Sequence, residues 1–232
     1  MSPTQADRFA NQYRALRAKE GWADSAGVEN PDRGPRELWA ARIESVREAA
    51  AIIAAEWPER RPLVADVGAG GGWAAEYLER TDVVSIDLIP IPNTHGAKRI
   101  RADMRFLPFA GRSMDGLLFI ASLHCAPLDE VVAEASRVLR PTGLLVAMDS
   151  PIYPDARSSE SAVARSAAYY GEAGFPDLAA HYHPLDAGRL RDAFDRHGLR
   201  IEQLRFSRGL ADVWRRLQGL SRSMLLVARR SD

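Results

Sequence analysis

The stretch LVADVGAGGGWAAEYL, residues 63–78, joins a short apolar run to four glycines within five positions and then to a segment with helical spacing. A buried strand that runs into a glycine-rich turn is typical of the first strand of an open α/β sheet, where the turn holds a ligand. A dinucleotide fingerprint needs glycine where this sequence has Trp73, and a P-loop needs a lysine that is absent from the turn. The turn therefore lacks a key residue of both phosphate-binding motifs.

Short apolar runs alternate with helical patterns on both sides of this turn. The runs that predict strands are 62–67, 82–87, 97–102, 115–122, 143–149, 199–206 and 223–230. The segments that predict helices are 4–19, 37–57, 72–80, 127–139, 157–170 and 185–198. This alternation predicts an α/β fold: a doubly wound, Rossmann-like sheet of seven mostly parallel strands, preceded by N-terminal helices.

The length of 232 residues suits one α/β domain rather than two. We expect a single domain with four parts: an N-terminal helical lid at 1–60, a ligand-binding core at 61–150, an insertion over the ligand site at 151–185, and a C-terminal helix and strands at 186–232. Four prolines interrupt the alternating pattern between 151 and 184, which is the reason for expecting an insertion there.

Composition limits the partners and the compartment. Lys+Arg and Asp+Glu are both 31, so no net charge draws the chain to nucleic acid or to anionic lipid. The single cysteine, Cys125, excludes an internal disulfide and fits a reducing compartment. The sequence has neither an apolar leader at its start nor a run long enough to span a bilayer. We expect a cytoplasmic protein without a nucleic-acid or membrane partner.

Acidic residues stand at or just after three of the predicted strands. Asp66 lies at the end of the first strand, and Asp87 follows 21 residues later at the end of the second. An acid at the end of the second strand can accept hydrogen bonds from both hydroxyls of a ribose. Asp103 follows the third strand in the same way. Because parallel strands end at one edge of a sheet, these carboxylates are expected near one another.

Two further segments contain sequence motifs that are to be read together with the glycine turn and Asp87. They are IRADMRFLPFAGRSMDGLLF, residues 100–119, and SLHCAPLDEVVAEASRVLRPTGLLVAMDSP, residues 122–151. With the glycine turn and Asp87, they resemble the class I S-adenosylmethionine-dependent methyltransferases, and most closely the small-molecule branch that includes ubiquinone and menaquinone methyltransferases. Thr142 stands where that family usually has glycine. The resemblance is dense over roughly residues 60–150 and looser beyond.

The resemblance implies S-adenosyl-L-methionine as the cofactor, held by a shell of nine residues: Asp66, Gly68, Ala69, Gly70, Gly72, Asp87, Leu88, Asp103 and Met104. In this shell the glycine turn holds the methionine part, Asp87 binds the ribose and Asp103 accepts from the adenine amino group. The physical logic agrees, because Asp66 offers an acceptor to the ammonium group. A helix N-terminus near Trp73 would favour the carboxylate.

The acceptor side is less defined by the sequence. His124, at the end of the fourth predicted strand, is the candidate general base, with packing under the cofactor as the alternative. The insertion supplies candidate substrate-binding residues, with lid packing as their alternative: Tyr153, Tyr170, His181 and His183. His181, His183 and Asp186 have the residue types of a metal site but no recognised spacing, and we expect no metal.

Aromatic residues near the N-terminus offer a cover for the cofactor. Phe9, Tyr13 and Trp22 are placed to fold over it, where a ring face favours a sulfonium; the alternative is that they only anchor their helix.

The predicted function is methyl transfer from S-adenosylmethionine to a small molecule, with oxygen, nitrogen or carbon as the methylated atom. One alternative is a protein of the same fold that binds the cofactor without methylating, as a sensor, a scaffold or a catalyst of another reaction. A nicotinamide-dependent oxidoreductase is disfavoured by Trp73, and RNA methylation by the neutral charge.

Overall fold

The computed structural model describes residues 3–23, 31, 36–90, 98–206 and 223–232. Parts of the predicted lid, 1–60, and of the C-terminal segment, 186–232, therefore lie outside the described residues. Within the described residues, no helix is long and apolar enough to cross a membrane.

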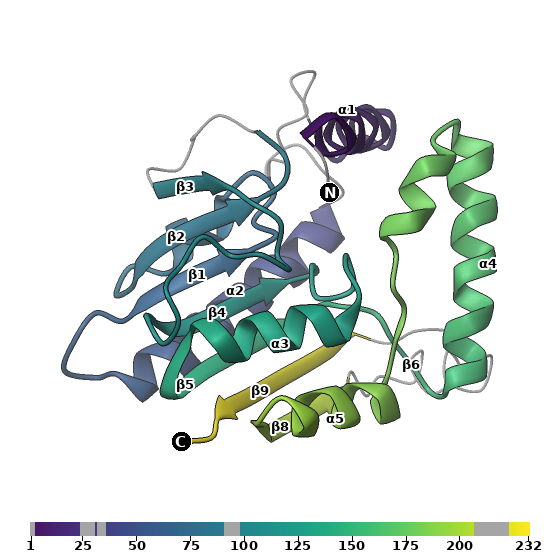
Figure 1. The fold of residues 1–232 in the computed structure, drawn as a ribbon. Helices are drawn as coiled ribbons and strands as arrows, with labels where there is room; N and C mark the ends of the chain where they lie inside the picture. The colour runs from purple at the N-terminus through teal and green to yellow at the C-terminus, as the bar shows by residue number, and fades with distance from the viewer. Residues whose placement is uncertain (1–2, 24–30, 32–35, 91–97, 207–222) are drawn as a thin grey trace.

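A seven-stranded sheet forms the centre of the protein (Figure 1). Its strands are β1 (Leu63–Val67), β2 (Asp82–Asp87), β3 (Lys98–Arg101), β4 (Met114–Ile120), β5 (Leu139–Met148), β8 (Leu199–Phe206) and β9 (Met224–Arg230). The order is β3-β2-β1-β4-β5-β9-β8, and only the pairings of β9 with β5 and with β8 are antiparallel. This confirms the predicted mostly parallel sheet. The chain reverses its direction of travel across the sheet between β1 and β4, which is where such sheets bind ligands.

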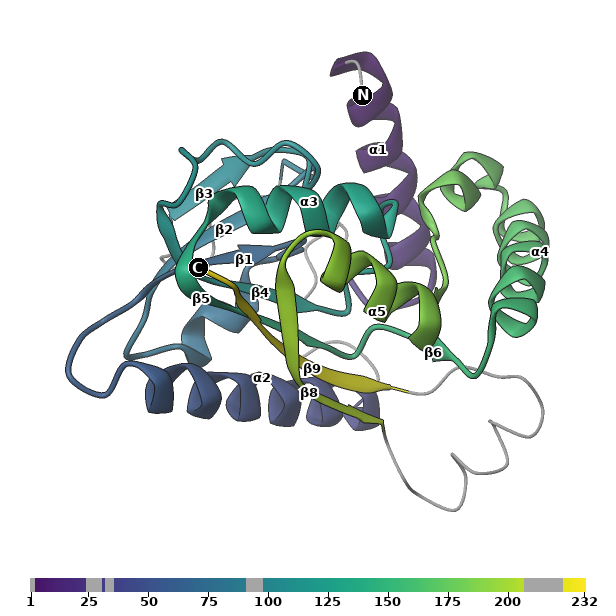
Figure 2. The same ribbon diagram turned by 60° about the horizontal axis from the view of Figure 1, so that its bottom comes forward.

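Helices cover both faces of the sheet (Figure 2). They are α1 (Pro3–Lys19), α2 (Arg36–Glu56), α3 (Leu128–Val138), α4 (Ala156–Ala173) and α5 (Ala187–Arg196). The helix α2 packs on one face through Ala49 and Ile53, and α3 and α5 cover the other through Val131 and Phe194. The fold therefore has three layers: α2, the sheet, and the pair α3 and α5. One apolar core lies on each face of the sheet.

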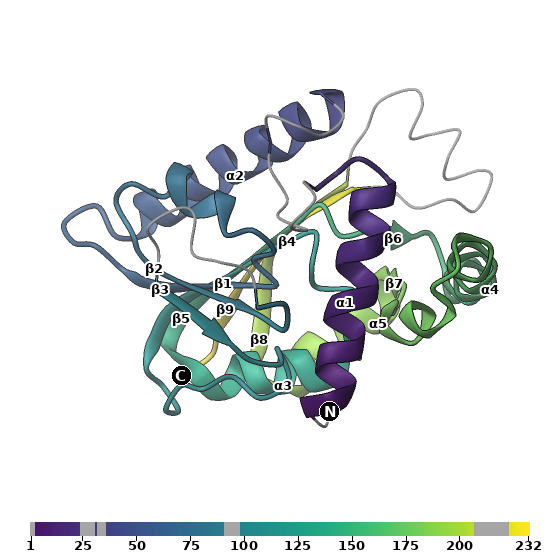
Figure 3. The same ribbon diagram turned by 90° about the horizontal axis from the view of Figure 1, so that it is seen from above.

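The segments outside these layers lie at one end of the sheet. The helix α1 crosses that end in the view from above (Figure 3). The insertion contains α4, a 3-10 helix η2 (Pro176–His181), and a two-stranded parallel pair, β6 (Ile152–Tyr153) with β7 (Leu185–Asp186). Contacts between α1 and η2 join the two segments.

The segment after the glycine turn differs from the prediction. Residues 72–80 were expected to form a helix, but only a five-residue 3-10 turn, η1 (Trp73–Tyr77), is present. Gly72 precedes it with a φ of 77°, and Trp73 packs edge-on against Trp39 of α2 at 5.1 Å between ring centroids. The aromatic packing anchors the segment against α2, and no N-terminus of a full helix faces the turn.

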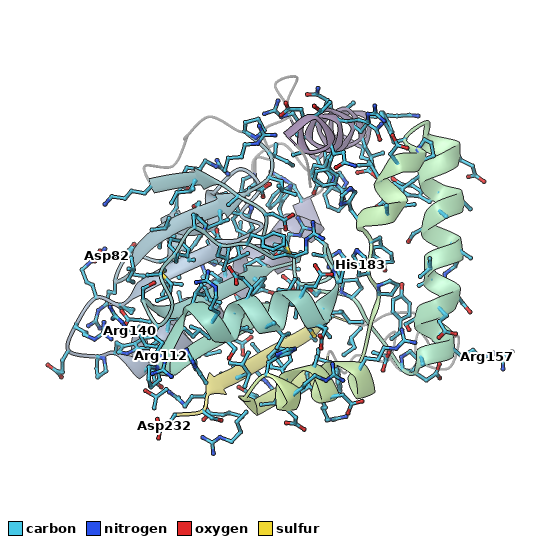
Figure 4. All side chains as sticks on the ribbon, in the orientation of Figure 1. Asp82, Arg112, Arg140, Arg157, His183 and Asp232 are labelled. Carbon is cyan, nitrogen blue, oxygen red and sulfur yellow. The ribbon has the colours of Figure 1, made fainter. Side chains whose placement is uncertain are left out.

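The opposite end of the sheet carries a charged cluster. Asp115, at the start of β4, accepts two hydrogen bonds of 2.8 Å from Arg60, one of 2.5 Å from Arg140 and one from the Leu63 amide. Burial opposes ionisation of Asp115, but these bonds prevail and lower its pKa to about 2. Figure 4 shows Arg140 at this end, far from the labelled His183.

Candidate functional site

A cavity of about 230 Å³ lies at the carboxyl ends of β1, β2 and β4. The glycine turn, the end of β2 and the loops after β3 and β4 form its floor and walls. Residues of α1, α2 and the end of η2 complete the lining. The cavity therefore occupies the switch point of the sheet, with segments from outside the sheet as its roof.

The glycine turn is shaped by close packing against the neighbouring strands. Gly68, Gly70 and Gly72 have φ values of 73°, 52° and 77°, a region that other residues adopt at a cost. A Cβ atom on Gly68 would lie 2.5 Å from Cβ of Ser122, which follows β4. Gly68 is thus required by the approach of the turn to β4. Gly68, Ala69 and Gly70 line the cavity, whereas the predicted cofactor residue Gly72 does not.

Asp66 lines the cavity at the end of β1 and is 1% exposed. Its Oδ2 atom has no hydrogen-bond partner. Burial and the nearby Asp87 raise the pKa of this carboxyl to about 7, although Arg99 acts in the opposite direction. A buried carboxylate oxygen without a partner is costly unless a ligand supplies one. This atom fits a ligand group that is a positively charged hydrogen-bond donor.

Asp87 connects the end of β2 to the glycine turn. Its Oδ2 accepts the Gly70 amide at 2.7 Å, and its Oδ1 accepts the Ile89 amide at 2.8 Å. Each carboxylate oxygen can accept more than one hydrogen bond, so Asp87 keeps capacity for hydroxyl groups of a ligand. The carboxylate also fixes the turn relative to β2, a role that the sequence did not predict.

Asp103, in the loop after β3, lines the cavity but already binds a guanidinium. Arg105 donates from Nη2 to Oδ2 at 2.7 Å and from Nε to Oδ1 at 3.0 Å. Burial would raise the pKa of Asp103, but the bonds from Arg105 hold it below its usual value. Met104 and Leu88 also line this part of the cavity. The predicted contact of Asp103 with an adenine amino group must therefore be shared with Arg105.

The helix α3 fixes the turn that follows this loop. Glu134 accepts the Leu107 amide at 2.6 Å, and Arg137 donates to the carbonyls of Leu107 and Phe109 at 3.0 and 2.9 Å. The helix α3 thereby fixes the turn at residues 107–109, which follows the loop that contains Asp103.

Arg42 is a lining residue that the sequence did not identify. It comes from α2, and its guanidinium carbon lies 5.0 Å from the ring centre of Trp22 and 5.5 Å from that of Trp39. Among the described residues, Arg42 forms no ion pair within 4 Å. The prediction that a helix N-terminus near Trp73 would favour a carboxylate fails with the 3-10 turn, and Arg42 offers a positive charge instead.

The predicted acceptor-side residues divide into two groups. His181 and His183 line the cavity, whereas Tyr153 and Tyr170 do not. The Tyr153 hydroxyl lies 3.0 Å from the hydroxyl of Tyr182, which makes it part of the packing of the insertion. In Figure 4, His183 lies between the insertion and the start of α3.

His124 is also outside the cavity lining. Its Nδ1 atom lies 3.4 Å from the Ser150 hydroxyl, and its carbonyl accepts the His183 amide at 2.8 Å. Burial, followed by the positive charges of Arg17 and Arg42, lowers the pKa of His124 to about 3. Such an imidazole is neutral at pH 7 and a weak base, which favours the packing role over the catalytic one.

The N-terminal aromatic residues also divide. Phe9 and Tyr13 line the cavity, and the Phe9 ring lies 4.3 Å from that of His181. Trp22 instead packs against Arg17 and Arg42. Contact between Phe9 and His181 closes the roof between α1 and η2.

The described residues contain no group of three or more His, Cys, Asp or Glu side chains that could hold a metal ion. Asp186, considered with His181 and His183, caps α5 by accepting the amides of Gly188 and Arg189.

Residues 65–147 match the family model described as a methyltransferase domain. This segment of the chain is therefore similar to a methyltransferase domain. The match includes the glycine turn and the strands β1 to β5 nearly in full. It confirms the resemblance drawn from the sequence.

Similar proteins extend this finding. A phthiotriol/phenolphthiotriol dimycocerosates methyltransferase of Mycobacterium ulcerans is 34% identical over 99 residues, 37% of this chain and 36% of that protein. A fatty-acid O-methyltransferase of Mycolicibacterium smegmatis is 33% identical over 107 residues, 40% of this chain and 37% of that protein. A structure of geranyl diphosphate methyltransferase with GPP and sinefungin has a TM-score of 0.67 at 14% identity, covering 97% of this chain and 99% of that one.

The chain spans between 16% and 37% of the length of the curated relatives it matches. The similarity to the solved methyltransferase extends over nearly the whole chain, and at 14% identity it establishes the shared fold.

Proposed function

We propose that this protein transfers a methyl group from S-adenosylmethionine to a small molecule. The observation that carries the proposal is the unpartnered buried Oδ2 of Asp66, which lines the cavity beside the glycine turn. The cofactor has a positively charged amino group that this oxygen can accept from. When bound, it supplies an electrophilic methyl group on a sulfonium.

The residues of the cavity fit the remaining groups of the cofactor. Arg42 would pair with the α-carboxylate, and Asp87 would accept from the ribose hydroxyls. Leu88 and Met104 would pack on the adenine, whose amino group would reach Asp103. The backbone of Gly68, Ala69, Gly70 and Gly72 would form the turn around the methionine part. In this arrangement the charged groups of the methionine part would face side chains of opposite charge, and the ribose and adenine would face hydrogen-bond acceptors.

Positioning and exclusion of water account for the catalysis in this proposal. Phe9 and Tyr13 of α1 cover the cavity, and Phe9 contacts His181 of η2. With a pKa near 3, His124 does not act as the base. In this proposal the chain orients the acceptor toward the methyl group, with His181 and His183 as acceptor contacts and without His124 as a base.

A small-molecule acceptor is favoured by the roof over the cavity and by the relatives named for fatty-acid and phthiotriol substrates. The balanced charge supports the absence of a nucleic-acid partner, and the single cysteine supports a cytoplasmic location. In this proposal one domain comprises the lid 1–60, the core 61–150, the insertion 151–185 and the segment 186–232.

Calorimetric titration with S-adenosylhomocysteine tests the cofactor assignment. We expect binding by the wild-type protein and loss of binding in Gly70→Arg, because the arginine side chain would enter the cavity. No binding by a folded wild-type protein would refute the proposal.

Transfer of labelled methyl groups from S-adenosylmethionine then tests the activity. A panel of carboxylic acids, alcohols, phenols and amines should contain an acceptor that gains the label. Binding without transfer to any acceptor would support a cofactor-binding protein that does not methylate.

A further inference from the structure

Arg99 lies on β3, at the edge of the sheet, and its side chain contacts the glycine turn. It is partly buried, and donates from Nη1 to the Gly71 carbonyl at 3.2 Å and from Nη2 to the Gly70 carbonyl. A Cβ atom on Gly72 would lie 3.5 Å from Nη1, so the guanidinium packs closely behind the turn. It does not line the cavity itself.

The same guanidinium interacts with two carboxylates that do line the cavity. Asp87 from β2 and Asp66 from β1 are the charged groups with which it interacts electrostatically. Around Asp66, the charged groups are Asp87 and Arg99, while the neighbouring wall at the end of β4 contributes the uncharged Ser122. The Arg99 guanidinium therefore interacts with the carboxylates of both Asp66 and Asp87.

We propose that Arg99 is a positioning residue of the cofactor site, which holds the glycine turn in place and favours the ionised form of Asp66 that receives the ammonium group of the cofactor. This inference rests on the proposed cofactor. Arg99 acts through the turn and through Asp66, without touching the ligand. The family resemblance assigned no role to this position.

The electrostatic reason is the proximity of two carboxylates. Two like charges in one site oppose each other's ionisation, and a nearby cation relieves the conflict. Arg99 lowers the pKa of Asp66, while burial and Asp87 raise it. Removing the guanidinium should therefore leave Asp66 protonated at neutral pH. A protonated carboxyl offers the ammonium group no negative charge.

The expected direction follows from the titration. Loss of Arg99 should raise the pKa of Asp66 above about 7, so that less than about one-half of the carboxyl groups are ionised at pH 7. Affinity for S-adenosylhomocysteine at pH 7 should then fall, and the midpoint of its pH dependence should shift to higher pH. Any disorder of the turn would add to the loss.

The test compares three variants by calorimetry with S-adenosylhomocysteine between pH 6 and pH 9. We expect Arg99→Gln to weaken binding and to raise the pH midpoint, and Arg99→Lys to restore both in part because the positive charge remains. Lys98→Gln is the matched control, since Lys98 is the preceding residue of β3 and is exposed. It should bind like the wild type. Thermal denaturation establishes that each variant is folded.

A second measurement separates charge from shape. In an Asp66→Asn background, Arg99→Gln should leave the pH dependence unchanged, because the titrating group has gone. A pH midpoint in Arg99→Gln equal to that of the wild type, or no rescue by lysine, would overturn the inference even if affinity fell. Failure of the wild-type protein to bind S-adenosylhomocysteine would instead refute the proposed cofactor.

Discussion

Replacing Asp66 with asparagine should stabilise the ligand-free protein while weakening the cofactor site. Burial and Asp87 raise the pKa of Asp66 to about 7, against about 3.9 in an unfolded chain. The folded state thus holds the proton more tightly than the unfolded state does. The contribution of this group to stability is complete below about pH 4 and is lost as the pH rises through 7. The difference of about three pKa units corresponds to about 4 kcal/mol.

Asparagine keeps the shape of the side chain but carries no charge at any pH. In the absence of ligand, we expect Asp66→Asn to raise the melting temperature, with an advantage that grows from pH 5 to pH 8. The 4 kcal/mol is an upper bound, because the amide must also be accommodated without a full set of partners.

Ligand binding should show the opposite effect. If only the ionised form of Asp66 binds the ammonium group, wild-type affinity for S-adenosylhomocysteine should rise about tenfold from pH 6 to pH 8. The asparagine variant should bind at least about tenfold more weakly at pH 8, because it loses a charge-assisted hydrogen bond, and with little dependence on pH.

Thermal denaturation without ligand and calorimetry at pH 6 and pH 8 check both expectations. Asp82→Asn is a matched control, because the Asp82 side chain is 62% exposed and its carboxylate pairs with Arg61 on the surface. It should change neither quantity by much. Equal wild-type affinity at the two pH values, or a lower melting temperature for Asp66→Asn at pH 8, would refute the reasoning.

Three other substitutions test separate parts of the structure. Arg42→Ala should weaken S-adenosylhomocysteine binding at least about tenfold but spare 5′-methylthioadenosine, which lacks the carboxylate; calorimetry with both ligands measures the difference, and equal losses would contradict the assignment. Gly68→Ala should prevent S-adenosylhomocysteine binding, since its Cβ would lie 2.5 Å from that of Ser122; normal calorimetric affinity would contradict this. Asp115→Ala should lower the free energy of unfolding in urea by about 3 kcal/mol at pH 7, leave binding unchanged, and lose its effect as the pH falls from about 4 toward 2. An effect of Asp115→Ala that is as large at pH 2 as at pH 7 would contradict the last expectation.

The sequence predicted the sheet well because most strands contain a short apolar run that is bounded by turn or helix signals. The strand β2 coincides with the predicted 82–87, and β8 with 199–206. The strand β5 begins at Leu139 rather than 143, because Leu139 pairs with Met114 ahead of an irregularity in the ladder. Such a pairing depends on the neighbouring strand and leaves no signal in the segment itself.

The predicted helix at 72–80 failed for a related reason. Its spacing is helical, but the packing of Trp73 against Trp39, 34 positions earlier, and the positive φ of Gly72 leave only a 3-10 turn. Tertiary contacts override local propensity in such short segments.

The sequence predicted site residues only at positions where a strand ends at the cavity. Asp66 and Asp87 end their strands, so strand prediction placed them at the cavity. Arg42 and Arg99 come from the middle of other elements, where the sequence indicates only which face is buried. Tyr153 and Tyr170 lie in an insertion whose path follows from no periodic pattern.

These placements give the site an ordered arrangement of charge. Asp66 lines the cavity beside the glycine turn, Arg42 lines it from α2 without an ion-pair partner among the described residues, and Arg99 supports the turn from behind. A ligand with an ammonium group and a carboxylate on one carbon would satisfy both Asp66 and Arg42. A ligand with neither would leave a buried carboxylate unpaired. On the proposed assignment, the unpaired carboxylate destabilises the protein without ligand, and this cost would favour binding of a ligand with a zwitterionic end.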